Sequence, residues 1–388
     1  MLTGDIKSSE EIGIHSISIG FDAKRAFYNK SGLGNYSRNL LYALADYYPQ
    51  NTYWLFTPGI SNRLRLENEE RFNIVEPGSF LFRMFPSIWR SKYMKRDIEQ
   101  HRLSIFHGLS QELPFGIEKT GIRSVVTVHD LIFMRYPEFY GRIDAGIYKQ
   151  KLIKACNSAD HIVAISSQTK SDLTELLDVS PDKISVILQS CNRNFWKSQD
   201  KESFNDVKLK YNLPDQYLLY VGTIEERKNL LGIIKAMQIK KINLPLVAVG
   251  RKAEPYYGKV SSYITENKIR NVIFPEKVLN EELPAIYQNA ECFIYPSLYE
   301  GFGIPVLEAV VSGTPVITSR DGCFPEAGGP GSIYVNPLDH EEMGEAILRV
   351  VSDTEERNKM INIGRNYSKK FTHDVIAGNY MKLYQSLI

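Results

Sequence analysis

The chain has 388 residues, 43% of them hydrophobic and 24% charged, and its formal net charge is +2. These values are typical of a soluble globular protein with room for two domains. The near-zero charge provides no overall field that would recruit nucleic acid, so no nucleic-acid partner is expected.

The four cysteines are widely spaced and form no metal-binding pattern, which favours reduced, buried thiols. The N-terminal residues 1–11 are polar, and no apolar run reaches the length of a bilayer span. We therefore expect a cytoplasmic protein.

In the first half, apolar runs of strand length alternate with helical patterns, as in an α/β domain with a parallel sheet. The predicted strands are 15–22, 52–57, 104–107, 123–129, 161–165 and 183–188. The clearest helices are 35–47 and 167–177, and serines suit the start of the second. Residues 192–214 are polar and weakly patterned, which predicts a linker.

The second half repeats this alternation and predicts a second α/β domain. Its predicted strands are 217–221, 246–249, 272–274, 292–295, 316–319 and 333–335. Two or three helices complete the chain from Asp339 onward. Candidate motifs follow strands in both halves, and ligands bind beyond the carboxyl ends of parallel strands, so we expect a site between the domains.

The most informative motif lies between Glu300 and Glu308, where a buried strand is followed by a glycine turn and a helix. Gly301 and Gly303 allow a ligand to approach the backbone, and Pro305 suits a first helical turn. The helix start favours phosphate, whereas the carboxylates suit hydroxyl groups on either side of it. A diphosphate with a sugar at each end, a nucleotide sugar, fits this arrangement.

A second motif, 221–230, follows a strand with a glycine and contains Arg227 and Lys228. Two cations there can stabilise the negative charge that develops on a departing diphosphate. A solvated turn with two surface cations is the alternative.

The string from Glu300 to Glu308 resembles the signature of the retaining family-four glycosyltransferases of GT-B fold, also called glycosyl transferases group 1. This resemblance implies an α/β chain of two doubly wound, Rossmann-like domains with the active site in the cleft between them. The domains would span residues 1–195 and 196–371, and a C-terminal helix, 372–388, would return to the first domain. Two isolated glutamates would more simply be solvated, but the string with its glycines and proline is more specific.

The resemblance also implies roles for individual residues. Glu300, Arg227, Lys228 and His129 would be catalytic: Glu300 positions the donor sugar, the two cations stabilise the leaving diphosphate, and His129 contacts the sugar. The donor-binding positions would be Gly32, Gly34, Gly222, Thr223, Val278, Gly301, Phe302, Gly303, Leu307 and Glu308, the last for the ribose. Thr223 departs from many relatives, which carry arginine there.

Several matches in the first half have simpler explanations. Gly32-Leu-Gly34 resembles the family's glycine loop but is equally typical of a turn. His129 ends a strand and is paired with Asp130, expected to orient it, although such a histidine is often only structural. Ser166, Ser167 and Lys170 resemble a further family stretch, but helix capping explains the serines.

The segment 274–283 resembles the part of the family that reads the nucleotide base through its main chain. Lys277 and Val278 occupy the matching positions. A plain surface loop is the alternative.

Residues 80–96 contain five basic side chains, no acidic ones and many large apolar ones. Such a segment could contact an anionic membrane or a lipid-linked acceptor. An internal helix with a basic solvated face is the alternative.

These patterns favour retaining transfer of a sugar from a nucleoside diphosphate to an acceptor hydroxyl, in polysaccharide or glycolipid assembly. The motifs resemble mannosyltransferases, so the expected donor is GDP-mannose, with a UDP-sugar as the alternative. A sugar-nucleotide epimerase, a phosphorylase and a non-catalytic binding module are the competing hypotheses. The partners would be the donor and a saccharide or lipid-linked saccharide, at the inner face of the membrane if 80–96 touches it. No cofactor and no metal is expected.

Overall fold

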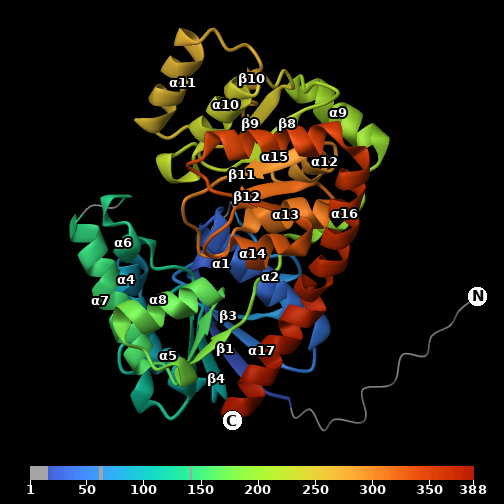
Figure 1. Ribbon diagram of the computed structural model, residues 1–388. Coiled ribbons are helices and arrows are strands. Elements are labelled where there is room, and N and C mark those ends of the chain that lie inside the picture. Colours follow the sequence, from blue (N-terminus) through green and yellow to red (C-terminus); the bar gives the residue numbers. More distant parts are fainter. Residues whose placement is uncertain (1–15, 61–63, 140–141) are drawn as a thin grey trace, which may run out of the picture.

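The computed structural model describes residues 16–60, 64–139 and 142–388 and contains two parallel β-sheets, one in each domain (Figure 1). The N-terminal sheet has seven strands in the order β3-β2-β1-β4-β5-β6-β7. The strands are β1 Ser18–Asp22, β2 Thr52–Phe56, β3 Asn73–Val75, β4 Ile105–Gly108, β5 Arg123–Val128, β6 His161–Ala164 and β7 Ile184–Val186.

The C-terminal sheet has six strands in the order β10-β9-β8-β11-β12-β13, and all its pairs are parallel. The strands are β8 Leu218–Val221, β9 Leu246–Val249, β10 Val272–Ile273, β11 Cys292–Tyr295, β12 Val316–Ser319 and β13 Ile333–Val335. Most of these strands are buried along their length and are rich in Val, Ile and Leu, as central strands covered by helices on both faces require.

Helices cover both sheets. Those of the N-terminal domain are α1 Lys24–Tyr28, α2 Gly32–Tyr47, α3 Phe80–Met84, α4 Pro86–Ile88, α5 Met94–Gln100, α6 Ile132–Arg135, α7 Arg142–Ser158 and α8 Ser167–Leu177. Those that follow are α9 Lys201–Tyr211, α10 Leu230–Ile239, α11 Tyr256–Glu266, α12 Leu283–Gln288, α13 Ile304–Ser312, α14 Phe324–Gly328, α15 His340–Ser352, α16 Thr354–Ser368 and α17 His373–Leu387.

The predicted α/β architecture with two parallel sheets is confirmed, and the predicted strands match the observed ones within a few residues. His15, in the first predicted strand, and the polar residues 1–11 lie outside the described residues. Strand β3 was not predicted, because Asn73–Val75 is a three-residue edge strand without a fully buried residue.

The prediction of a linker at 192–214 is wrong, because this stretch contains a short 3₁₀ helix, Arg193–Trp196, and the helix α9. Only a narrow stripe of α9 faces the core: Val207 is buried, and Phe204 and Tyr211 pack against the core partly buried. A stripe this narrow is easily missed in a polar sequence.

The prediction that helix α2 follows the glycine pair is also wrong, since α2 begins at Gly32 and includes Gly34. A Cβ atom on Gly34 would lie 1.8 Å from the Asn29 carbonyl oxygen. The glycine therefore allows α2 to pack on the turn that follows α1. Gly32 has no atom within 4 Å of its Cβ direction, so its surface is open.

The chain crosses back to the N-terminal domain at its end, where α17 packs on α2 (Figure 1). The contact is polar at its centre: the hydroxyl of Tyr380 lies 2.5 Å from that of Tyr36, which also bonds Thr127. Tyr384 lies 2.7 Å from His107 Nδ1, and His107 Nε2 lies 2.8 Å from Thr127. The boundaries predicted at 195/196 and 371/372 stay predictions.

None of the helices in the described ranges is both long and apolar enough to span a bilayer.

The buried pair between Tyr384 and His107 gives a test of this C-terminal contact. Replacing Tyr384 with Phe leaves a ring nitrogen of a fully buried histidine without a partner, which should destabilise the protein by roughly 1–3 kcal/mol. Urea unfolding would measure the change, with the exposed Tyr47→Phe on α2 as the control. Equal stability of the two variants would contradict the role assigned to this network.

Candidate active site

The loop between β11 and α13 forms the centre of the site. Gly303 is the N-cap of α13, with φ of +96°, and Pro305 lies in the first turn, as predicted. The amides of Val306 and Leu307 already donate to the Gly303 carbonyl, at 3.0 and 3.2 Å. In the described ranges no acceptor is found for the amides of residues 302–304. These three amides, at the start of α13, are therefore available to an anion.

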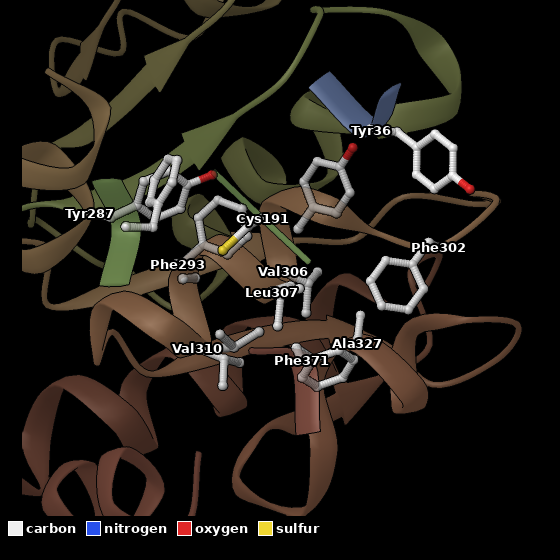
Figure 2. Close-up of a cluster of buried hydrophobic side chains, with 14 of the residues drawn as sticks. Tyr36, Cys191, Tyr287, Phe293, Phe302, Val306, Leu307, Val310, Ala327 and Phe371 are labelled. Atoms are coloured by element: carbon white, nitrogen blue, oxygen red, sulfur yellow. The ribbon is translucent and has the colours of Figure 1, made fainter. Parts of the chain in front are cut away.

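The side chains of Phe302 and Leu307 do not face the site. Both are buried in the apolar cluster of Figure 2, which also contains Val306, Val310 and Phe371. The rings of Phe302 and Phe371 pack edge to face, with centroids 6.0 Å apart. Only the backbone of these two predicted donor-binding residues can therefore reach a ligand.

Glu300 carries its contacts on one oxygen. Its Oε1 accepts from Tyr295 at 2.8 Å and from Ser297 at 3.2 Å, and it lies 2.7 Å from Arg227 Nη1 and 3.8 Å from Lys228 Nζ. Burial opposes ionisation, but the charges of Lys228 and Arg227 outweigh it and lower the pKa of Glu300. The carboxylate is thus ionised, and among the described residues none donates to its Oε2.

The two predicted cations have different surroundings. Arg227 donates to the Tyr299 carbonyl and, at 2.7 Å, to Glu225, besides its pair with Glu300. Its guanidinium is therefore largely occupied by the protein. Among the described residues, Lys228 has only the long contact to Glu300, and it lies over the Tyr295 ring, 5.6 Å from the ring centroid. Lys228 is the cation with free donor capacity.

The strand glycine makes room for this lysine. A Cβ atom on Gly222 would lie 3.3 Å from Lys228 Nζ, and Thr223 accepts from Tyr220 through its carbonyl at 3.0 Å. Gly222 therefore belongs to the site through Lys228. In the described part of the chain, no contact of the Thr223 side chain is seen.

Glu308 lies one turn into α13 and is partly buried. Burial raises its pKa to about 8, although the hydroxyl of Tyr287, at 3.3 Å, and the charge of Lys228 act in the opposite direction. At neutral pH this carboxyl is therefore mostly protonated, in contrast to Glu300.

Val278 is half-buried against the core, in the connection after β10. The preceding Lys277 has φ of +54°, and its carbonyl accepts from Tyr211 at 3.3 Å. The structure places both residues beyond the carboxyl end of the sheet but gives no contact between them and Glu300 or Lys228.

His129 comes from the opposite domain, directly after β5. Its Nε2 lies 2.9 Å from the Leu109 carbonyl oxygen, and its ring packs edge to face on Tyr36 at 4.6 Å. Burial lowers the pKa of His129 to about 4, so the ring is neutral. Because a carbonyl only accepts, Nε2 carries the proton, and Nδ1 is left as an acceptor.

The expected orienting contact between Asp130 and His129 is wrong. The Asp130 carboxyl accepts from the Ile132 amide at 3.1 Å, and the Leu109 carbonyl holds the His129 ring instead. Burial raises the pKa of Asp130 to about 6, against the opposing effects of the Ile132 amide and Arg227.

The two domains meet at Gly301. A Cβ atom on this glycine would lie 2.1 Å from the carbonyl oxygen of His129, so no other residue fits without a shift. Ser166 donates to the Gly301 carbonyl at 2.6 Å. Glycine at this position thus brings the loop of Glu300 against the strand end that bears His129.

Helix α8 supplies contacts that the sequence did not reveal. Ser166 caps the helix, as expected, and Ser167 also binds Glu326 of α14 through its amide and hydroxyl, at 2.8 and 2.6 Å. Asp172 accepts from Tyr299 of the other domain. No motif marks these residues, because their partners lie more than 120 positions away. Lys170, in contrast, donates to the Ile184 carbonyl within its own domain.

A cavity of about 230 Å³ lies beside His129 in the N-terminal domain. Arg25, Leu33, Gln111, Asp130 and Lys151 line it with others. Leu33 lies between the two predicted glycines, so the start of α2 does face the site. In residues 16–60, 64–139 and 142–388 no cluster of three or more His, Cys, Asp or Glu side chains could hold a metal ion.

Two family models match the chain. The model described as Glycosyltransferase Family 4 matches residues 30–190, and the one described as Glycosyl transferases group 1 matches residues 201–367. Each thus covers most of one domain.

Two relatives are each 29% identical to this chain over the aligned residues. One is the O-antigen chain mannosyltransferase B of Escherichia coli, over 77% of this chain and 77% of the relative. The other is the O-antigen chain mannosyltransferase RfbU of Salmonella typhimurium, over 66% of this chain and 68% of the relative.

Solved structures share the whole fold. HepE of Anabaena, in complex with UDP and glucose, matches 96% of this chain and 100% of its own with a TM-score of 0.73 at 14% identity. A glycosyltransferase of Rickettsia africae matches 96% of this chain and 98% of its own with a TM-score of 0.72 at 16% identity. The family models, the relatives and the two-domain fold agree, and the chain therefore belongs to the family-four, group 1 glycosyltransferases of GT-B fold.

Proposed function

We propose that this glycosyltransferase moves mannose from GDP-mannose to a hydroxyl of a saccharide acceptor, with retention of configuration, during polysaccharide assembly. One observation carries the proposal: two adjoining loops of the C-terminal domain bring together Lys228, the ionised Glu300 and three amides for which the described ranges hold no acceptor, and the loop of Glu300 contacts His129 of the other domain. The names of the relatives support mannose and O-antigen polysaccharide. A UDP-sugar is the alternative donor.

In this proposal the diphosphate lies against Lys228 and the amides of residues 302–304. When the bond between the sugar carbon and the phosphate oxygen breaks, the electron pair leaves with the diphosphate. The lysine charge and the amides are already in place for that negative charge, which lowers the barrier. Arg227 acts by keeping Glu300 ionised and fixed, because its own donors are occupied.

The sugar itself lies between Glu300 and His129. The unpartnered Oε2 of Glu300 and Nδ1 of neutral His129 both accept hydrogen bonds from sugar hydroxyls, one from each domain. The acceptor hydroxyl attacks from the side that the diphosphate leaves, and its proton passes to the departing phosphate oxygen. Neither an enzymic nucleophile nor a metal ion takes part in this scheme.

Glu308 is proposed to bind the ribose. Its carboxyl is protonated in the free protein, and two ribose hydroxyls favour the ionised form by donating to it. Donor binding should therefore release a proton near neutral pH.

Substitution of Lys228 by Ala, or of Glu300 by Gln, should lower transfer by about 10²–10³-fold, because each removes a group placed for the transition state. The assay is nucleoside diphosphate release from GDP-mannose with and without a saccharide acceptor. Glu266→Gln, at an exposed glutamate at the end of α11 on the same domain, is the control, and thermal unfolding checks folding. Near-normal turnover in either folded site variant would contradict the roles proposed for these residues.

Glu308 should give the protein a specific pH dependence. Folding raises the pKa of Glu308 from 4.5 to about 8, so the folded state binds the carboxyl proton more tightly than the unfolded state does. The contribution of this proton to the free energy of unfolding is complete below about pH 4.5 and is lost as the pH rises through 8. Glu308→Gln should remove this loss, so the variant should gain a few kcal/mol over the wild type between these limits.

Urea unfolding across that pH range measures the stability difference, and calorimetric titration with GDP in two buffers measures the proton released. The expected release is absent in Glu308→Gln. Identical pH profiles for the two proteins would show that Glu308 is ionised when free and is not the coupled group.

A further inference from the structure

Five large apolar side chains within nine residues stand out from the surface of the N-terminal domain. We call them the apolar patch: Phe80, Leu81, Met84, Phe85 and Ile88, each 46–74% exposed. Soluble monomers rarely expose so many large apolar groups together unless the surface binds something.

The segment that bears the patch is anchored to the N-terminal domain by the two residues that follow it. Trp89 is buried, and Arg90 pairs with Asp22 at 2.5 Å and with Glu112 at 3.0 Å. The segment is a series of short helices whose solvated side at 80–88 carries the apolar patch beside the exposed Arg83, so the expected alternative, an internal helix with a basic solvated face, describes only part of it.

A cavity of about 250 Å³ opens next to the patch, lined by Ser87 and Ser91 of this segment and by Phe115. Its charged lining consists of Lys24, Arg25, Arg90, Lys151, Lys154, Asp22 and Glu112, five cations and two carboxylates. Arg90 engages both carboxylates. In the described chain neither Lys24 nor Arg25 has a carboxylate partner.

The positive charge in this cavity is therefore not balanced. Lys24 is partly buried, and its pKa is lowered by burial and by the charges of Arg90 and Arg25. A group with two or more negative charges would relieve this repulsion. One surface lysine without a partner would carry no such information, but five clustered cations that share two carboxylates do.

The cation-lined cavity continues into the cavity beside His129. The two share Arg25, Glu112, Tyr148 and Lys151 in their linings. Helices α4 and α7, which border this region, lie on the same flank of the N-terminal domain (Figure 1). Apolar surface, positive charge and the reacting centre thus follow one another along one path.

We propose that this path binds an acceptor carried on a membrane lipid through a diphosphate. The apolar patch enters the bilayer, the cation-lined cavity takes the diphosphate, and the saccharide reaches His129. This order of hydrocarbon, anion and sugar is the order of chemical groups in such a lipid. The inference rests on the proposed function and names the class of its acceptor.

Vesicle cosedimentation of the full chain tests the site without any turnover. The probes are phosphatidylcholine vesicles doped with a polyprenyl diphosphate and vesicles brought to the same negative charge with phosphatidylglycerol. The wild type should bind the first about tenfold more tightly. Lys24→Gln/Lys154→Gln should abolish that preference, whereas Lys359→Gln, an exposed lysine on α16, should not.

A second pair of variants tests the apolar patch in the same vesicle assay. Leu81→Ser/Phe85→Ser should weaken binding to both kinds of vesicle by about tenfold, and Leu209→Ser, an exposed leucine on α9, should leave it unchanged. Equal binding of the wild type to both vesicles overturns the diphosphate site, and unchanged binding of the patch variant, or self-association through the patch, overturns the membrane contact.

A separate measurement isolates the proposed function. If transfer from GDP-mannose to a soluble saccharide occurs but vesicles show no diphosphate preference, only this inference fails. If the preference is present and no donor sugar is transferred to any acceptor, the proposed function fails.

Discussion

The close approach of Gly301 to the His129 carbonyl is the contact on which the site depends. A hydrogen atom in place of a side chain lets a loop of one domain touch a strand end of the other. Hydrogen bonds from Ser166 to Gly301 and between Ser167 and Glu326 hold the same contact from helix α8. Because Glu300 and His129 adjoin this contact, it determines how the two side chains are placed relative to each other.

The electrostatics of the site follow from a few neighbours. Glu300 and Glu308 lie eight residues apart, yet only Glu300 has two cations beside it, so its pKa is lowered, whereas burial dominates at Glu308 and raises its pKa. The two cations differ in their hydrogen-bond partners: Arg227 donates to protein acceptors, whereas the donors of Lys228 are left for a ligand. Two adjoining loops and helix α13 thus bring together an ionised carboxylate, a protonated carboxyl and a cation, the set of groups that the proposed nucleotide-sugar donor requires.

Much of the fold could be predicted from the sequence, because buried parallel strands such as Cys292–Tyr295 and Leu246–Val249 are continuous apolar runs between turn residues. Gly303 and Pro305 were informative since the start of α13 demands them locally, whereas the need for glycine at position 301 comes from its contact with the other domain. Contacts between distant segments could not be predicted: the pairing of Arg227 with Tyr299, the interdomain role of Ser167 and the contact of His129 with the Leu109 carbonyl all depend on the tertiary fold. Which side chains of residues 80–88 face the solvent could not be predicted either, because helices this short show no regular spacing of apolar residues in the sequence.

Gly301 offers the most direct test of this account. In Gly301→Ala the added methyl group meets the His129 carbonyl, and the domains must separate, so transfer should fall by about a hundredfold. Binding of GDP, measured by titration calorimetry, should change little, since the proposed diphosphate contacts lie within the C-terminal domain. Gly146→Ala, where the added atom meets open space, is the control. A Gly301→Ala protein with wild-type turnover would show that this contact does not assemble the active site.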